Sequence, residues 1–115
     1  MKRVLFDEDV PQQLRRELSE FEIRTVQEEG WASAKNGVLL ARSSGVFDVL
    51  VTADKRLQYQ QNIATYQIGV VVLGTRDTRL PRLLAVIGEL RTAIDDVQPG
   101  TVMVVRSNEQ AASQS

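Results

Sequence analysis

Residues 49–62, VLVTADKRLQYQQN, decide the fold, because an apolar, strand-like run ends there in Asp54. Glutamines and an asparagine follow the aspartate closely. A short continuous apolar run is typical of a strand that is buried on both faces, as in a parallel sheet. A carboxylate directly behind such a strand lies at its carboxyl end, where open α/β sheets bind their ligands. The segment therefore predicts a buried strand with a candidate site at its end.

Strand-like and helix-like segments alternate along the rest of the chain. The segments expected as strands are residues 2–6, 23–26, 47–53, 68–74 and 99–105. Those expected as helices are residues 9–21, 37–45, 54–66 and 79–97. This alternation favours an α/β fold, a three-layer sandwich around a five-stranded parallel sheet. Right-handed crossovers narrow the topologies, and the order 2-1-3-4-5 of a Rossmann-like sheet is the simplest fit.

The expected helices have apolar faces at helical spacing, with Asp9 as a plausible N-cap of the first helix. The side chains expected to face the core are Val10, Leu14, Leu18 and Phe21 in the first helix, Tyr59, Ile63 and Tyr66 in the third, and Leu83, Val86, Leu90 and Ile94 in the last.

The length of 115 residues fits one domain, which we place at residues 1–105. Residues 106–115 are polar and without periodicity, so we expect a disordered C-terminal tail. No apolar run approaches the roughly 20 residues that span a bilayer, and the N-terminus lacks the apolar stretch of a signal peptide. We therefore expect a cytoplasmic protein that does not associate with membranes.

The chain contains no cysteine and no histidine, and its net charge is −1. Thiolate metal sites, thiol nucleophiles and Ser-His triads are thereby excluded. A large basic surface for duplex DNA is not expected at this charge. Any chemistry must therefore depend on carboxylates, amides, hydroxyls, lysine and arginine.

Two groups of acids follow strands that the predicted order places side by side. Asp7 and Glu8 follow the first strand, and Asp54 follows the third. Taken singly, each acid is equally typical of the first turn of a helix. Together they would repel each other, and a hard cation such as Mg²⁺ or Mn²⁺ relieves that repulsion. Without a cation, we expect repulsion to destabilise the charged form of Asp54.

The chain up to residue 105 resembles a compact PIN-like branch of the PIN-domain nuclease superfamily. The matching segments are VLFDEDVP (4–11), GWASAKNGVLLA (30–41), FDVLVTADKRLQYQQN (47–62) and PGTVMVV (99–105). The resemblance implies a PIN-like fold and a Mg²⁺- or Mn²⁺-dependent ribonuclease. It also implies that Asp7 and Asp54 are catalytic metal ligands and that Glu8 is a third ligand or positions water.

Many members of this superfamily are toxins of toxin–antitoxin pairs. The resemblance therefore implies RNA as a partner and, for a toxin, a cognate antitoxin protein; a homodimer is left open. One departure stands at residues 34–37, AKNG, where such nucleases usually carry another acid. Lys35 and Asn36 occupy this place, and Asn36 is equally well interpreted as a helix cap. Fewer anionic ligands predict weaker metal binding and make a two-ion mechanism doubtful.

Polar and aromatic side chains near the expected crevice are candidates for contact with RNA. On a helix, Gln58 and Gln61 would share a face with Asp54. Amides bond base edges or phosphates, lysines neutralise phosphates, and a tryptophan stacks on bases. Solvated polar surface and a hydrophobic Trp31 are the simpler alternatives. The candidate cleft residues are Trp31, Lys35, Asn36, Lys55, Gln58, Gln61 and Asn62.

Two other functions stay open. One is a catalytically degenerate PIN-like module that binds RNA or protein. The other is a receiver-like phosphoacceptor domain, which shares this topology and places a threonine after the fourth strand, as Thr75 stands here. Receivers carry a lysine after the fifth strand, where this chain has Arg106.

Overall fold

The computed structural model describes residues 1–106. Five parallel strands form one sheet in the order β2-β1-β3-β4-β5, which confirms the predicted fold and strand order. The strands are Arg3–Phe6 (β1), Glu22–Thr25 (β2), Val49–Thr52 (β3), Gly69–Leu73 (β4) and Val102–Val105 (β5).

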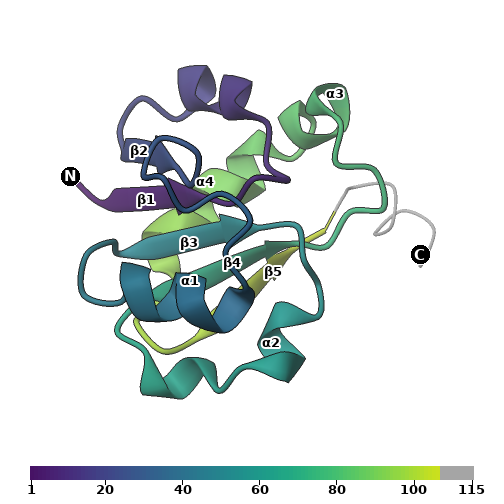
Figure 1. Ribbon diagram of the computed structural model, residues 1–115. Coiled ribbons are helices and arrows are strands. Elements are labelled where there is room, and N and C mark those ends of the chain that lie inside the picture. Colours follow the sequence, from purple (N-terminus) through teal and green to yellow (C-terminus); the bar gives the residue numbers. More distant parts are fainter. Residues whose placement is uncertain (107–115) are drawn as a thin grey trace.

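Helices cover both faces of the sheet, so the molecule has three layers (Figure 1). One face is covered by α1 (Asn36–Ser43), α2 (Leu57–Gln60) and the 3-10 turn η2 (Ile63–Thr65). The other face is covered by the 3-10 helix η1 (Gln12–Glu17), α3 (Leu80–Leu84) and α4 (Ile87–Asp96).

Strands β1 and β3 lie side by side, with Val4 opposite Val49 and Phe6 opposite Val51. The chain passes from β1 to the edge strand β2 and then returns to the other side of β1 to form β3. Because the strands are parallel, the residues that follow β1 and β3 emerge at the same edge of the sheet. This register brings Asp7 and Asp54 to one crevice.

The central strands are buried on both faces, as their unbroken apolar sequences predict. Leu50 packs into the cluster beneath α1 and α2, and its neighbour Val51 packs into the cluster beneath η1 and α4. Both side chains are fully buried. A single strand thus contributes to two cores.

The first helical segment is shorter and tighter than predicted, because only Gln12–Glu17 is helical and it forms a 3-10 helix. Pro11 is its N-cap, in an extended conformation, so the interpretation of Asp9 as the cap is wrong. The Asp9 carboxylate instead accepts a hydrogen bond from the backbone of Ala53. The predicted apolar face is nevertheless confirmed: Val10, Leu14, Leu18 and Phe21 are all buried.

The third helical segment is also broken, since α2 contains only Leu57–Gln60 and an extended Gln61 ends it. Only Leu57 of this turn is buried, so too little apolar surface holds a longer helix in place. Ile63 is buried and Tyr66 is partly buried, as predicted. Tyr59 was expected to face the core, and this prediction is wrong because the residue is 83% exposed.

The last helical segment divides into α3 and α4 at Val86, whose φ of −115° and ψ of 20° leave the helical region. The buried face predicted from its spacing is confirmed, because Leu83, Val86, Leu90 and Ile94 are fully buried. Burial of Val86 itself between the two helices accounts for the break, since tertiary packing outweighs local helix propensity there.

Of the tail predicted over residues 106–115, all but Arg106 lie outside the described residues. Within residues 1–106, none of the helices combines the length and the apolar character that crossing a bilayer requires.

Truncation on either face of β3 is expected to destabilise the protein strongly. Leu50→Ala should lower the free energy of unfolding by about 2–5 kcal/mol, the cost of a cavity in a packed core. Val51→Ala should lower it by about 2 kcal/mol through the loss of two buried methyl groups. Val46→Ala serves as the control, because Val46 is 43% exposed, and should change little. Urea titration measures the free energy of unfolding of all three variants. An unchanged value for Leu50→Ala or for Val51→Ala would contradict the two-core arrangement.

Candidate functional site

The hydroxyl of Thr52 joins the two acids that follow β1 and β3. Its Oγ1 donates a hydrogen bond of 2.7 Å to Oδ2 of Asp7 and accepts one of 3.1 Å from the backbone N–H of Asp54. Thr52 is fully buried at the last position of β3. The relation between Asp7 and Asp54 is therefore set by the sheet and not by flexible side chains.

Asp7 is buried directly behind β1, and hydrogen bonds hold both its backbone and its carboxylate. Its backbone N–H donates to the carbonyl of Val51 at 2.9 Å, which extends the β1–β3 pairing by one residue. Its Oδ1 accepts a bond of 2.9 Å from the backbone N–H of Glu8, and only 9% of the residue is exposed. Both carboxylate oxygens are thus oriented by neighbouring groups.

Asp54 has partners that favour its charged form. The side-chain amide of Asn36, at the start of α1, donates a bond of 3.0 Å to Oδ2 of Asp54. The backbone N–H of Arg56 donates to Oδ1 at 3.0 Å, and its guanidinium lies 3.4 Å from the same oxygen. The bond from Asn36, followed by those from Arg56, holds the pKa of Asp54 below its usual value of 3.8. The expectation that repulsion destabilises the charged Asp54 is therefore wrong.

Asp9 is a third acid at this edge, and the sequence interpretation missed its role. Its Oδ1 accepts a bond of 3.2 Å from the backbone N–H of Ala53, on the connection between β3 and Asp54. Although the residue as a whole is exposed, partial burial of the carboxyl raises its pKa, and the charges of Asp7 and Asp54 raise it further. Burial and the neighbouring acids thus disfavour the charged form of Asp9.

One signal in the sequence could have identified Asp9. Asp7 and Asp9 both stand in the run FDED directly behind β1, where a side chain can reach the carboxyl end of the sheet. The cap interpretation competed with this signal because Pro11 follows two residues later.

Glu8 reaches the loop before α1. It is exposed, and its Oε1 accepts a bond of 3.3 Å from the backbone N–H of Ser33. Ser33 has a φ of 69°, so the loop turns sharply at this contact. Glu8 therefore contacts the loop backbone, and its predicted role as a ligand stays a prediction.

The predicted cleft residues divide into two groups. Because α2 is short, Asp54 and Gln61 both lie outside it, and the predicted polar stripe on one helix is wrong. Gln61 packs close to Gly37 in the first turn of α1, and Lys35 and Asn62 are exposed. Lys55 and Gln58 line a smaller pocket described below, and Lys55 also lines the pocket beside the acids.

Trp31 contributes to the core more than to the crevice. Its ring meets that of Phe47 edge-on, with 6.2 Å between the centroids, and it packs against the cluster beneath α1. These contacts agree with the simpler expectation that Trp31 is a hydrophobic packing residue. Stacking of Trp31 on a base stays a prediction.

An open pocket of about 440 Å³ lies beside the acids, at the carboxyl ends of the strands. Asp9 and Asp54 form its acidic side, and cationic side chains stand around them. Its lining also includes Lys55, Arg56, Thr75, Arg76 and Thr78. Acids and cations thus share one surface, with Arg56 paired to Asp54, and such a surface can hold a phosphate ester beside a metal or a general base.

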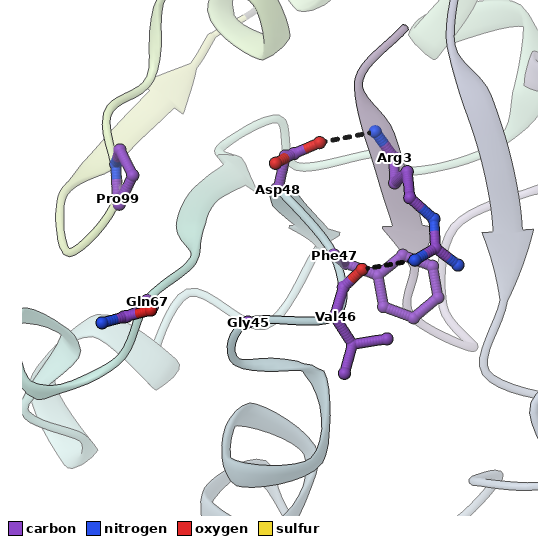
Figure 2. A pocket seen from close by; sticks show the side chains of 7 residues that line it. All are labelled: Arg3, Gly45, Val46, Phe47, Asp48, Gln67 and Pro99. Carbon is purple, nitrogen blue, oxygen red and sulfur yellow. Dashed lines mark hydrogen bonds between the residues drawn. The ribbon is translucent and has the colours of Figure 1, made fainter.

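A second pocket lies at the opposite edge, at the amino ends of β1 and β3 (Figure 2). Asp48 accepts a bond of 2.8 Å from the backbone N–H of Arg3, and the Arg3 guanidinium donates one of 2.9 Å to the carbonyl of Val46. The same guanidinium lies 5.1 Å from the centre of the Phe47 ring. The charged groups of this pocket already have protein partners, Asp48 in the backbone of Arg3 and the Arg3 guanidinium in Val46 and Glu22, so it is a weaker candidate for chemistry.

The donor atoms at the acidic edge suit Mg²⁺ or Mn²⁺, because they are carboxylate and amide oxygens. Within residues 1–106, no three acidic side chains are grouped closely enough to enclose a metal ion. Mg²⁺, however, is commonly held by one or two carboxylates and several waters. Asp7 and Asp54 fit that mode of binding, because the hydroxyl of Thr52 bonds to the carboxylate of one and to the backbone of the other.

Comparisons of the chain with protein-family models, with curated proteins and with solved structures found no match. The PIN-like resemblance therefore stays a prediction, and the case for a function depends on the geometry of the acidic edge.

Replacing Asp9 and Asp54 by asparagine should change stability in opposite directions in metal-free buffer at pH 7. Asp9→Asn keeps an oxygen for the Ala53 amide and removes a charge that burial and its neighbours disfavour, so the protein should become more stable. Asp54→Asn loses charge-assisted hydrogen bonds and should become less stable by about 1 kcal/mol. Urea titration in EDTA measures both differences.

The pH dependence provides a control for this pair. The folded pKa of Asp54 is lowered, so its contribution to stability is present above 3.8 and is lost as the pH falls through the lowered value. The folded pKa of Asp9 is raised, so the gain from Asp9→Asn is full above that raised value, declines as the pH falls below it and is gone below 3.8. If both substitutions change the free energy of unfolding in the same direction, or if the changes do not vary with pH, this assignment of charges is contradicted.

Proposed function

We propose that the chain is a PIN-like, Mg²⁺- or Mn²⁺-dependent ribonuclease that cleaves RNA at the acidic edge of its sheet. The observation that supports the proposal is the hydroxyl of Thr52, which bonds both Asp7 and the backbone of Asp54 behind the paired strands β1 and β3. Asp9 adds a third acid at this edge, where it accepts a bond from the backbone of Ala53. With no histidine or cysteine in the chain, these carboxylates are the groups best suited to hydrolysis of a phosphodiester.

Each acid has a distinct part in this proposal. A bound Mg²⁺ or Mn²⁺ would stabilise the charge that develops on the phosphate and lower the pKa of an attacking water. Asp7 and Asp54 would hold the ion, since one is fixed by Thr52 and the other stays charged beside Asn36. Asp9 would accept the proton of the attacking water, because a raised pKa makes a carboxylate a more effective base.

Asn36 takes the place of the acid that PIN-like nucleases usually carry, and its amide supports Asp54 through a hydrogen bond. This neutral group lowers the number of anionic ligands, so the proposal includes one metal ion rather than two. Membership of a toxin–antitoxin pair, with an antitoxin as partner, is proposed from the resemblance alone.

The receiver-like alternative has one observation in its favour, since Thr75 lines the same pocket as Asp54. Against it, both carboxylate oxygens of Asp54 already accept hydrogen bonds, and Thr75 donates its own hydroxyl to the carbonyl of Asp77 at 3.1 Å. Incubation with acetyl phosphate distinguishes the two, because a receiver would gain one phosphoryl group on Asp54, as read by mass spectrometry.

The proposal is tested by incubating the purified protein with an unstructured RNA and an excess of Mn²⁺ over protein. Cleavage should cease in EDTA. Asp54→Asn and Asp9→Asn should each reduce kcat/KM by about 100-fold or more, the loss typical when a group that stabilises the transition state is removed.

The matched control is Asp95→Asn, an exposed acid at the end of α4, whose backbone carbonyl contacts Lys2 at the other edge of the sheet. This variant should cleave at the parental rate. Activity that survives EDTA, or an Asp54→Asn variant as fast as the parent, would refute the proposed mechanism.

Asn36→Asp gives a separate test that needs no turnover. The new carboxylate would replace an amide that lies 3.0 Å from Oδ2 of Asp54, so like charges would meet there. In EDTA the variant should melt at a lower temperature than the parent, and Mn²⁺ should raise its Tm more than it raises that of the parent. Melting curves with and without Mn²⁺ measure both. An equal response of the two proteins to Mn²⁺ would exclude Asn36 from the metal site.

A further inference from the structure

A small pocket of about 230 Å³ adjoins the acidic pocket, between α2 and the ends of β4 and β5. Lys55 and Arg76 line both pockets, so the two are continuous along one surface. Figure 1 shows α2 lying near the carboxyl ends of these strands. The smaller pocket is lined by side chains of Lys55, Gln58, Tyr59, Arg76 and Arg106, among others.

The cations of this pocket have no charged or hydrogen-bonding partner in the part of the chain that the structure describes. Lys55, Arg76 and Arg106 are exposed, and within residues 1–106 none of them forms an ion pair or a side-chain hydrogen bond. Most other arginines of the chain are paired, as Arg24 is with Glu29 and Arg79 with Asp77. Three unpaired cations at one small pocket, in a chain of net charge −1, indicate a place for an anion.

Tyr59 adds an aromatic surface to the same pocket. It lies on α2 and is 83% exposed. An exposed aromatic ring forgoes the stabilisation that burial of its large apolar surface would give. Gln58 stands beside it with an amide that can donate and accept hydrogen bonds. An exposed ring, an amide and cations together match the parts of a nucleotide, which are a stacking base, polar base edges and a phosphate.

We propose that this pocket binds the nucleotide next to the cleaved phosphodiester of a single-stranded RNA. The base stacks on Tyr59, Gln58 contacts the base edge, and Lys55, Arg76 and Arg106 neutralise the flanking phosphate. This assignment rests on the proposed function, because the neighbouring acidic pocket is where cleavage is proposed. Single strands are selected, because the bases of a duplex are stacked internally and cannot reach Tyr59.

The test is the binding of a fluorescein-labelled, unstructured RNA nonamer, measured by anisotropy in EDTA so that no metal-dependent cleavage occurs. Tyr59→Ala should weaken binding by about fivefold or more, and Tyr59→Phe should bind like the parent, since stacking needs the ring and not the hydroxyl. A hairpin RNA duplex should bind equally weakly to the parent and to Tyr59→Ala.

The salt dependence tests the cations. Each phosphate contact on a single strand contributes about 0.7 to the slope of log K against log salt, so Arg76→Gln should reduce the slope by about that amount. Arg16→Gln is the matched control, because Arg16 is an exposed arginine that forms no ion pair with any residue from 1 to 106. It lies on η1, which covers the other face of the sheet. Its slope should equal that of the parent.

The outcomes separate this inference from the proposed function. Weaker binding of Tyr59→Ala and Arg76→Gln, in a protein that cleaves no RNA with Mn²⁺, would support the nucleotide pocket and overturn the nuclease. Cleavage with Mn²⁺ at parental kcat/KM in both variants, together with parental binding, would overturn the pocket and leave the nuclease. Parental binding by Tyr59→Ala alone would overturn the stacking role.

Discussion

The parallel pairing of β1 with β3 is the constraint on which the site depends. Residues that are 45 positions apart in the chain, Asp7 and Thr52, meet because Phe6 lies opposite Val51 in the register. A slip of one residue would turn every side chain of a strand to the opposite face, and both cores would lose their packing. Burial of β3 on two faces therefore fixes the crevice as well as the fold.

The charges at this edge are distributed unevenly. Asp54 is supported by Asn36 and Arg56, whereas Asp9 combines partial burial with two acidic neighbours, so their pKa values move apart. Carboxylates with pKa values displaced in opposite directions are suited to different tasks, one as a permanently charged ligand and the other as a base. Asn36 is central to this division, because an acid in its place would remove the support that Asp54 receives.

Next to the acids, the charge of the surface changes from negative to positive, since Lys55 directly follows Asp54. Lys55 lines both pockets. A polyanion bound here would meet cations on one side and, in the presence of a divalent ion, neutralised carboxylates on the other. The short α2 turn contributes to this arrangement, because its brevity leaves Tyr59 outside the core and at the edge of the cationic pocket.

The sequence by itself determined the strands, their order and the buried faces, because apolar periodicity and the alternation of segments follow directly from which side chains must avoid water. It also placed Asp7, Asp54 and Asn36 near one edge. Only the tertiary structure decided how long each helix is and which partner each acid has. The Asp9 carboxylate bonds to Ala53 instead of capping a helix, and Tyr59 faces water instead of the core. Both outcomes depend on contacts between distant parts of the chain, and local propensity contains no information about such contacts.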